Sequence, residues 1–383
     1  MESQRDSLPT LRWGIIGKSS HIIVEPSSTK SPLGAGLISS WFTKDITIPR
    51  KSPAATHKIQ AIGSSSLEKG RAFVDTHLAT LNPKPTVYSN YGDVYNDPGV
   101  DIVYIGTPHG LHKQHCLDAI AAGKHVLCEK AFTLNATEGR EVLAAAQAKG
   151  VFIMEAMWTR FHPLVSKLKH VLFQEKAIGD VRRTFCDFGL DKDIASLPNT
   201  SRLRDPAMGA GSLLDIGIYA LTWGLLTLES DPAKSERPRV VAAQTLRDGV
   251  DIVTSFILHY PSTGRQGILT STTEARTPEI FMRIEGSNGY ITVEGIAASA
   301  PRAFTVYPKV ESRSSGADAG ADGRRYDLEL EGMGFYFEAD AVAKSISQGK
   351  LEIEVMSHSE TVRVLEILDE IRTQGGTRFP GEA

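Results

Sequence analysis

The first 155 residues alternate between short apolar stretches and longer amphipathic ones. The apolar stretches end at glycine or polar residues, which is typical of buried parallel strands. These predicted strands are residues 11–17, 58–63, 87–91, 100–106, 123–131 and 151–155. The predicted helices between them are residues 37–45, 116–122 and 135–149. Strands that alternate with helices predict an α/β domain with a doubly wound parallel sheet over residues 10–155.

The rest of the chain, residues 156–383, changes to a strand-like alternation of apolar and polar positions. The stretches with this period are residues 181–190, 239–247, 251–260, 266–274, 279–285 and 290–294. They predict an α+β domain with a large, mainly antiparallel open sheet, a loop over residues 312–324 and a final helix over residues 357–373. One face of such a sheet covers helices, and a wide open face commonly forms a subunit interface. We therefore expect a homodimer.

Composition narrows the classes of protein that need to be considered. The net charge of the 383 residues is −3, with 23% charged residues, which favours neither a nucleic-acid partner nor an anionic membrane. The three cysteines are odd in number and fall within predicted elements, so they are expected to be reduced. The longest apolar run, residues 213–228, is interrupted by Asp215, and residues 1–10 lack the apolar core of a signal peptide. We expect a cytoplasmic protein.

The first strand runs into Gly17, the usual opening of a dinucleotide-binding unit, but the glycine pattern stops there and resumes at residues 34–36. If residues 18–34 are removed, a continuous phosphate-binding turn appears, with Ser39 as its third small residue. The cofactor-binding residues expected from this turn are Gly14, Gly17, Ala35, Gly36, Leu37 and Ile38. We interpret residues 18–34 as an insertion of 17 residues, either a retained or mispredicted intron, which we favour, or a genuine loop.

The end of the second strand indicates which dinucleotide binds. Units that bind NAD carry an acidic residue there, which holds the ribose 2′-hydroxyl. This chain has Ser64 and Ser65 in its place, followed by Lys69, a combination that suits a 2′-phosphate. The sequence therefore favours NADP over NAD. The alternative is that these residues only form the solvated start of a helix.

Two other strands end in residues that can bind a ligand or take part in catalysis. Ligands of open parallel sheets bind outside the carboxyl ends of the strands. Two sets of residues should therefore face the ligand: Thr107, Pro108 and His109 after one strand, and Glu129 and Lys130 after the next. Burying a lysine that has no partner and no function would cost free energy, so Lys130 is the first candidate for a catalytic residue. It could instead be a strand end held in an ion pair.

Histidine, tryptophan and arginine residues also occur near these strands. Histidines recur every third residue from His109 to His115, a spacing that does not suit a metal site, so no metal is expected. Trp158 and Arg160 follow the last strand of the first half. They could form a wall of the cofactor pocket or pack the junction between the two domains.

Residues 208–219 contain a second set of candidate site residues, in a segment where glycines lead into an apolar helix. Asp215 and Tyr219, at positions i and i+4, should lie on one helix face, while Gly217 allows a neighbour to approach closely. An aspartate within an apolar helix needs a partner if it is buried, and Lys130 is the natural one. The alternative is an aspartate that merely caps the helix or pairs locally.

Three motifs together resemble the Gfo/Idh/MocA oxidoreductases. They are Glu129-Lys130-Ala131 after Gly-Lys-His-Val, the Glu-Ala-Met-Trp-Thr-Arg-Phe sequence of residues 155–161, and the Gly-x-Leu-Leu-Asp-Ile-Gly-Ile-Tyr sequence of residues 211–219. The resemblance covers nearly the whole chain apart from residues 18–34 and the loop near residue 312, and it is strongest to the dimeric dihydrodiol dehydrogenases and the fungal NADP-dependent D-xylose 1-dehydrogenases. The chain departs from the family in its interrupted glycine turn and in Ala131, where the family usually has proline.

The resemblance implies an N-terminal Rossmann domain and an NADP-dependent dehydrogenase. Lys130 and Tyr219 would be the catalytic pair, and Asp215 would orient Lys130 and the substrate hydroxyls. The substrate would be an aldopyranose such as D-xylose, oxidised to a lactone, or a cyclic trans-dihydrodiol. Two alternatives stay open: an oxidoreductase that tailors another cyclic alcohol, and a binding or regulatory protein that has lost its cofactor because the phosphate turn is interrupted.

Overall fold

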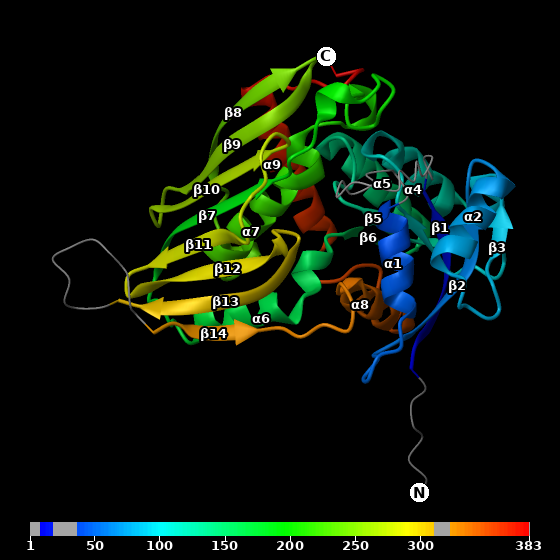
Figure 1. Cartoon of the computed structure of the whole chain (residues 1–383), viewed down its shortest axis with the longest axis horizontal. Helices are drawn as coiled ribbons and strands as arrows, with labels where there is room; N and C mark the ends of the chain where they lie inside the picture. The colour runs from blue at the N-terminus through cyan, green and yellow to red at the C-terminus, as the bar shows by residue number, and fades with distance from the viewer. Residues whose placement is uncertain (1–7, 18–36, 310–321, 383) are drawn as a thin grey trace, which may run out of the picture. The chain divides into compact units, whose positions relative to one another are not determined.

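A computed structural model describes residues 8–17, 37–309 and 322–382, and the chain forms two compact units (Figure 1). The first unit comprises Met1–Trp158 and Leu330–Val362, and the second comprises Thr159–Glu329 and Arg363–Ala383. The division differs from the expected one, because residues 330–362 return to the first unit. The proposed insertion at residues 18–34, together with Ala35 and Gly36, lies outside the described residues.

The first unit is built on a parallel sheet of six strands in the order β3-β2-β1-β4-β5-β6. Its strands are β1 (Thr10–Ile16), β2 (Thr56–Gly63), β3 (Thr86–Tyr88), β4 (Ile102–Ile105), β5 (His125–Glu129) and β6 (Ile153–Ala156). Its helices are α1 (Leu37–Thr47), α2 (Leu67–His77), α3 (Tyr91–Asn96), α4 (His112–Ala121), α5 (Ala136–Lys149) and α8 (Phe335–Ser347). This is the strand order of a dinucleotide-binding Rossmann domain, so the predicted fold class of the first half is confirmed.

Helix α8 joins this unit through a buried carboxylate that the sequence analysis did not single out. Asp45, near the end of α1, accepts hydrogen bonds from the backbone N–H groups of Met333 (2.6 Å), Gly334 (2.9 Å) and Phe335 (2.7 Å). These groups have no partner inside α8 because they lie at or before its first turn. The carboxylate of Asp45 therefore links the start of α8 to α1, although the two helices are far apart in the sequence.

The second unit contains a sheet of eight strands in the order β14-β13-β12-β11-β7-β10-β9-β8. Its strands are β7 (Val181–Gly189), β8 (Arg239–Arg247), β9 (Val250–Tyr260), β10 (Arg265–Thr272), β11 (Ile280–Gly286), β12 (Gly289–Ala297), β13 (Ala300–Pro308) and β14 (Arg324–Asp327). All neighbours are antiparallel except β7 and β10, which confirms the large, mainly antiparallel sheet. Strands β13 and β14 were not predicted, and most of the predicted loop at residues 312–324 lies outside the described residues.

The remaining α-helices among the described residues are α6 (Pro163–Lys169), α7 (Ile218–Leu228) and α9 (His358–Gly375). Helix α7 packs on β7 and β10, where Gly224 lets it approach Leu269 so closely that an added Cβ would lie 2.7 Å from that side chain. One described stretch, Pro206–Leu228, is long and apolar enough to cross a membrane, but 94% of it is buried in the structure. It is therefore a core segment of this unit.

Candidate active site

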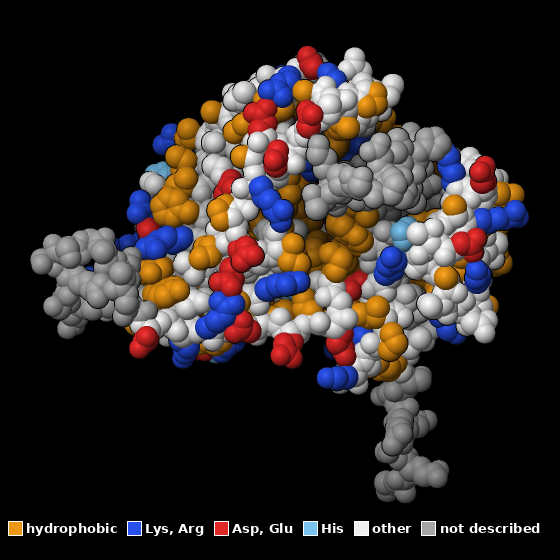
Figure 2. Space-filling model, viewed as in Figure 1, with side chains coloured by type: hydrophobic (Ala, Val, Ile, Leu, Met, Phe, Trp, Pro, Cys, Tyr) orange, Lys and Arg blue, Asp and Glu red, His pale blue; other side chains and the backbone are white. Residues whose placement is uncertain are grey.

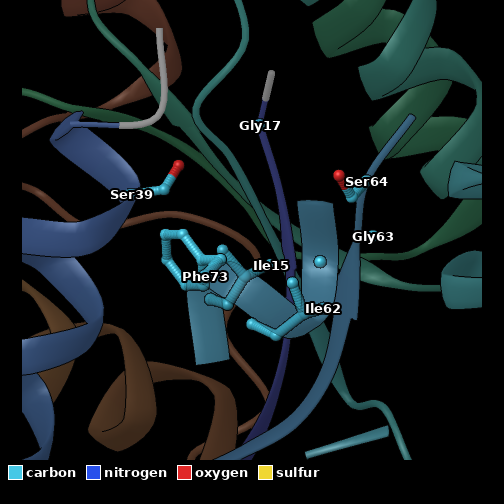
Figure 3. A pocket seen from close by; sticks show the side chains of 8 residues that line it. Ile15, Gly17, Ser39, Ile62, Gly63, Ser64 and Phe73 are labelled. Carbon is cyan, nitrogen blue, oxygen red and sulfur yellow. The ribbon is translucent and has the colours of Figure 1, made fainter. Parts of the chain in front are cut away.

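The ends of β1 and β2 in the first unit border a small pocket (Figure 3). The residues that line it are Ile15, Gly17, Ser39, Ile62, Gly63, Ser64, Gly70 and Phe73. Ser39, in the first turn of α1, and Ser64, after β2, stand on either side of Gly17. The pocket lies where parallel sheets of this order bind a dinucleotide.

Ser39 occupies the position that the interrupted fingerprint requires of its third small residue. A Cβ on Gly17 would lie 2.6 Å from the Ser39 hydroxyl, and one on Gly106, just after β4, would also clash with it. Helix α1 therefore packs against the strand ends without room for a larger side chain, which is the packing role of the third small residue. The other predicted residues of this turn that are described, Gly14, Gly17, Leu37 and Ile38, lie in or next to β1 and α1.

Three hydroxyl groups at this edge of the sheet are buried without a partner among the described residues: those of Ser39, Ser64 and Thr107. Their residues are 2%, 3% and 6% exposed. A buried hydroxyl without a hydrogen bond costs roughly 1–3 kcal/mol, so three at one edge of a sheet indicate that a polar ligand completes them. The residues present therefore suit a dinucleotide, which supplies phosphate and ribose oxygens.

The segment expected to choose between NADP and NAD follows β2. Ser65 is exposed, and Ser66 caps α2 by accepting a hydrogen bond from the backbone N–H of Lys69 at 3.3 Å. Lys69 is only partly buried and lies in the first turn of α2. No acidic residue takes the place immediately after β2, so the preference for NADP stays a prediction supported by Ser65 and Lys69.

A buried histidine connects the two strand ends that carry the predicted catalytic and cofactor residues. The ring nitrogens of His112 lie 2.7 Å from the Thr107 carbonyl oxygen and 2.9 Å from the Ala131 carbonyl oxygen. Burial lowers the pKa of His112 to about 4, although the carbonyl groups act in the opposite direction. His109 contacts the Lys130 carbonyl oxygen at 3.2 Å. The histidines thus hold the loop after β4 against the Lys130–Ala131 peptide, which is cis.

The histidine spacing does not produce a metal centre in the described part of the chain. Within residues 8–17, 37–309 and 322–382, no group of three histidine, cysteine, aspartate or glutamate side chains is placed to hold a metal ion. His115, the third histidine of the series, instead contacts the Tyr95 hydroxyl at 3.2 Å.

Glu129 and Lys130 sit at the end of β5, as predicted, and a further carboxyl group lies near them. Glu129 is 4% exposed and accepts a hydrogen bond from the Tyr104 hydroxyl at 2.6 Å. Glu338, on α8, is fully buried, and neither of its oxygens has a partner in the described residues. Burial, followed by the nearby carboxylates of Glu129 and Asp45, raises the pKa of Glu338 well above its usual range. Both causes disfavour the ionised form of the Glu338 side chain.

This buried acid predicts that stability depends on pH. A carboxyl whose pKa is raised by folding favours the folded state below its unfolded pKa, about 4.3, and this contribution is lost as the pH rises. Histidines whose pKa is lowered by folding, such as His112, act in the opposite direction over this range, so the test is a comparison of two slopes. From pH 5 to pH 8, the melting temperature of Glu338→Gln should fall less, or rise more, than that of the wild type, because an amide does not ionise. Thermal unfolding across this range is the measurement, with Glu354→Gln, at an exposed glutamate of the same unit, as control. An unchanged slope in Glu338→Gln would contradict the assignment.

In the second unit, Asp215 and Tyr219 lie at the junction of two helical types. Residues Leu213–Gly217 form a π-helical turn that continues into α7. The simple α-helical spacing assumed from the sequence is therefore not the local geometry. A Cβ on Gly217 would lie 2.7 Å from the Ser271 hydroxyl of β10, so the close approach predicted at Gly217 is present. Turns of this type occur often at functional sites.

A buried carboxylate that the sequence analysis missed holds the start of this turn. Asp251, 2% exposed, accepts hydrogen bonds from the Leu213 N–H (2.7 Å) and from the hydroxyls of Ser212 (2.8 Å) and Thr254 (2.9 Å). Burial raises the pKa of Asp251, and these three hydrogen bonds act in the opposite direction. Asp251 thus fixes the first residues of the helix that carries Asp215 and Tyr219.

The partner of Asp215 within this unit was also not predicted. The ammonium of Lys192 lies 3.1 Å from Asp215 Oδ2, and the guanidinium of Arg202 lies 3.8 Å from Oδ1. Asp215 thus forms ion pairs inside its own unit. Tyr219 is 5% exposed, and its ring lies 5.7 Å from that of Phe188. Lys130 belongs to the first unit, so its predicted pairing with Asp215 stays a prediction.

Trp158 and Arg160 occupy the short helical segment Trp158–Phe161, at the boundary between the units. The Trp158 ring stacks on Phe335 of α8 with a centroid distance of 4.2 Å, within the first unit. Arg160 belongs to the second unit and is 6% exposed. Trp158 therefore packs in the first unit, and the cofactor roles of both residues stay predictions.

The fold and the pocket define a dinucleotide-binding protein with a second, sheet-based domain. Residues 33–157 match the family profile described as "Oxidoreductase family, NAD-binding Rossmann fold", and residues 166–292 match the GFO/IDH/MocA C-terminal domain. The chain belongs to the GFO/IDH/MocA oxidoreductase family, which confirms the resemblance found in the sequence. The first match begins at residue 33, beside the resumed glycine pattern.

Similar proteins extend the match to nearly the whole chain. The chain is 32% identical to D-xylose 1-dehydrogenase (NADP(+)) of Hypocrea jecorina, over 97% of this chain and 93% of that protein. It is 34% identical to trans-1,2-dihydrobenzene-1,2-diol dehydrogenase of Sus scrofa, over 97% and 98%. Among solved structures, a levoglucosan dehydrogenase in complex with NADH and levoglucosan shares the fold, with a TM-score of 0.74, 18% identity and coverage of 96% and 97%.

Proposed function

We propose that this protein is an NADP-dependent dehydrogenase that oxidises a hydroxyl group on a cyclic substrate, with D-xylose or a trans-dihydrodiol as the leading candidates. The observation that carries the proposal is the pocket at the ends of β1 and β2, where the buried hydroxyls of Ser39 and Ser64 have no partner among the described residues. The chain also resembles two dehydrogenases over 97% of its length. The name of the Hypocrea relative includes NADP(+), and the serines after β2 suit the same cofactor.

The predicted residues divide the reaction between them. When bound, the nicotinamide supplies the acceptor for the hydride that leaves the substrate carbon. The proposal assigns Tyr219 the role of the general base that removes the proton of the substrate hydroxyl, and Lys130 the role of the cation that favours the phenolate form of this base. Asp215 orients the hydroxyl groups by accepting their hydrogen bonds. The products are the oxidised substrate, NADPH and a proton.

The choice of cofactor can be tested at Ser65. Ser65→Asp places a carboxylate where a 2′-phosphate would bind, and it can also accept a hydrogen bond from a 2′-hydroxyl. We expect KM for NADP to rise at least about tenfold, while KM for NAD changes little or falls, because the introduced charge repels only the phosphate. Steady-state kinetics with both cofactors give the answer, and an equal change for the two would contradict NADP preference.

Binding and substrate screens distinguish the proposal from its rivals. NADPH fluorescence is titrated with the protein, and NADP reduction is then followed with pentoses, hexoses, dihydrodiols and other cyclic alcohols. The proposal predicts NADPH binding and turnover of a sugar or a dihydrodiol. Turnover of another cyclic alcohol alone would favour a tailoring oxidoreductase. Absence of NADPH binding would favour a binding or regulatory protein.

We also propose that the chain forms a homodimer through the open face of its second sheet. In the register of β8, β9, β10 and β7, a row of apolar side chains lies on one face: Val241, Ile257, Ile268 and Phe185. Val241 is 56% exposed and Ile257 is 36% exposed, and Figure 2 shows hydrophobic side chains over these strands. Sedimentation should give twice the chain mass of 41.6 kDa, and Ile257→Glu should give a monomer. A monomeric wild-type protein would refute the interface.

A further inference from the structure

We infer that Lys192 is a substrate-binding residue that, together with Asp215, recognises a hydroxyl group other than the one that is oxidised. The inference rests on the proposed function and deepens it, because it restricts the substrate to compounds with at least two hydroxyl groups. It assigns a role to a lysine in the irregular segment after β7.

The lysine side chain is directed inward by its backbone. The Lys192 N–H donates to the Thr273 carbonyl oxygen at 2.9 Å, just beyond the end of β10, and its own carbonyl accepts from Ile194 at 2.7 Å. Both neighbours, Asp191 and Asp193, are exposed, whereas the Lys192 side chain is only 7% exposed. The segment thus presents its charged neighbours to solvent and buries the ammonium.

The buried ammonium has more donors than the described protein uses. A lysine carries three N–H donors, and Asp215 Oδ2, at 3.1 Å, is the only acceptor that the described residues provide. A buried charge is costly unless its donors are satisfied, so the remaining donors can bind an additional acceptor such as a substrate hydroxyl.

The chemistry of the pair specifies the ligand. Lys192 can only donate hydrogen bonds and an ionised Asp215 can only accept them. A hydroxyl group does both, so it can accept from the ammonium while it donates to the carboxylate. Arg202, 3.8 Å from Asp215 Oδ1, places a second cation beside the carboxylate. A substrate with several hydroxyl groups, such as a sugar or a diol, matches this arrangement better than a simple cyclic alcohol.

The test combines a change in the protein with a change in the substrate. Lys192→Met keeps the length of the side chain and removes the charge, and Lys192→Arg keeps the charge. Lys234→Met, at an exposed lysine of the same unit that also pairs with an aspartate, is the matched control. Each variant is assayed with the best sugar or diol substrate and with analogues that lack one hydroxyl group each.

We expect Lys192→Met to lower kcat/KM about 10- to 100-fold for the full substrate, mainly through KM, as for the loss of a hydrogen bond to a charged group. For the analogue that lacks the hydroxyl group bound by Lys192, the wild-type enzyme should show a similar loss of kcat/KM. With that analogue, Lys192→Met should lower kcat/KM by less than about threefold relative to the wild type. Lys192→Arg should restore part of the activity, and Lys234→Met should behave as wild type. If Lys192→Met does not fold, the wild-type enzyme must still lose at least tenfold with one deoxy analogue.

The outcomes separate this inference from the proposed function. A lysine that only stabilises the segment would lower the melting temperature and would act equally on all analogues, and that result would overturn the inference while leaving the dehydrogenase intact. The same holds if no deoxy analogue is discriminated by the wild-type enzyme. A wild-type protein that oxidises no sugar or diol would overturn the proposed function, and the role of Lys192 with it.

Discussion

Replacing Tyr219 by phenylalanine is expected to lower kcat about 10²- to 10⁴-fold, the usual contribution of a positioned general base. The change removes one oxygen from a ring that is 5% exposed and lies beside Phe188, so packing should be preserved. Steady-state assays of NADP reduction measure kcat, and thermal unfolding measures stability. Tyr307→Phe, which alters a tyrosine that stacks on Tyr290 in the same unit, serves as the control. Near-normal turnover by Tyr219→Phe would refute its role as the base.

Replacing Lys130 by methionine is expected to cost about 10²- to 10³-fold in kcat/KM at neutral pH and to move the pH dependence. Without a neighbouring cation a phenol keeps a higher pKa, near 10, so the activity that remains should increase with pH beyond the range of the wild-type enzyme. The pH profile of kcat/KM is the measurement, and Lys113→Met, at a lysine that pairs with Glu141 in the same unit, is the control.

The double variant tests whether Lys130 and Tyr219 act as one unit. Residues that serve the same step lose activity in a non-additive way, because the first substitution already removes the step. Lys130→Met combined with Tyr219→Phe should therefore be within about tenfold of the slower single variant. Losses that multiply would indicate two independent roles and would contradict a shared step.

The parallel sheet could be predicted because each of its strands is a short apolar run bounded by glycine or by polar residues. This pattern also identified the strand ends at Thr107 and Lys130, since the carboxyl ends of parallel strands share one edge. The Gly217 contact could be predicted for a similar reason, because glycine within an apolar helix commonly marks a close approach. These features depend on residues that are near one another in the sequence.

The features that could not be predicted depend on distant residues or on irregular backbone. Helix α8 belongs to the first unit because Asp45 binds residues 333–335, a contact that leaves no periodic pattern in the sequence. Strand β14 is a four-residue edge strand. Lys192 lies outside any helix or strand, so nothing in the local pattern relates it to Asp215. From the sequence alone, Lys192 could have been noted only as a lysine between two aspartates.

The buried carboxyl groups show the same limit. Glu338 and Asp251 occupy ordinary positions in a helix and a strand. Only the surrounding packing shows that the Glu338 carboxyl has no hydrogen-bond partner within residues 8–17, 37–309 and 322–382, whereas Asp251 accepts three hydrogen bonds. Sequence patterns report how a segment folds, whereas the protonation state of a group depends on what packs around it.

A crystal structure of the protein with NADP and a bound sugar or dihydrodiol tests the central claim most directly. The account predicts that the Tyr219 hydroxyl and the Lys130 ammonium both lie within about 3 Å of one substrate oxygen. The carbon that bears this oxygen should face the nicotinamide ring. If the complex instead places Lys130 and Tyr219 in separate cavities, or the substrate away from both, the assignment as a dehydrogenase with this catalytic pair is contradicted.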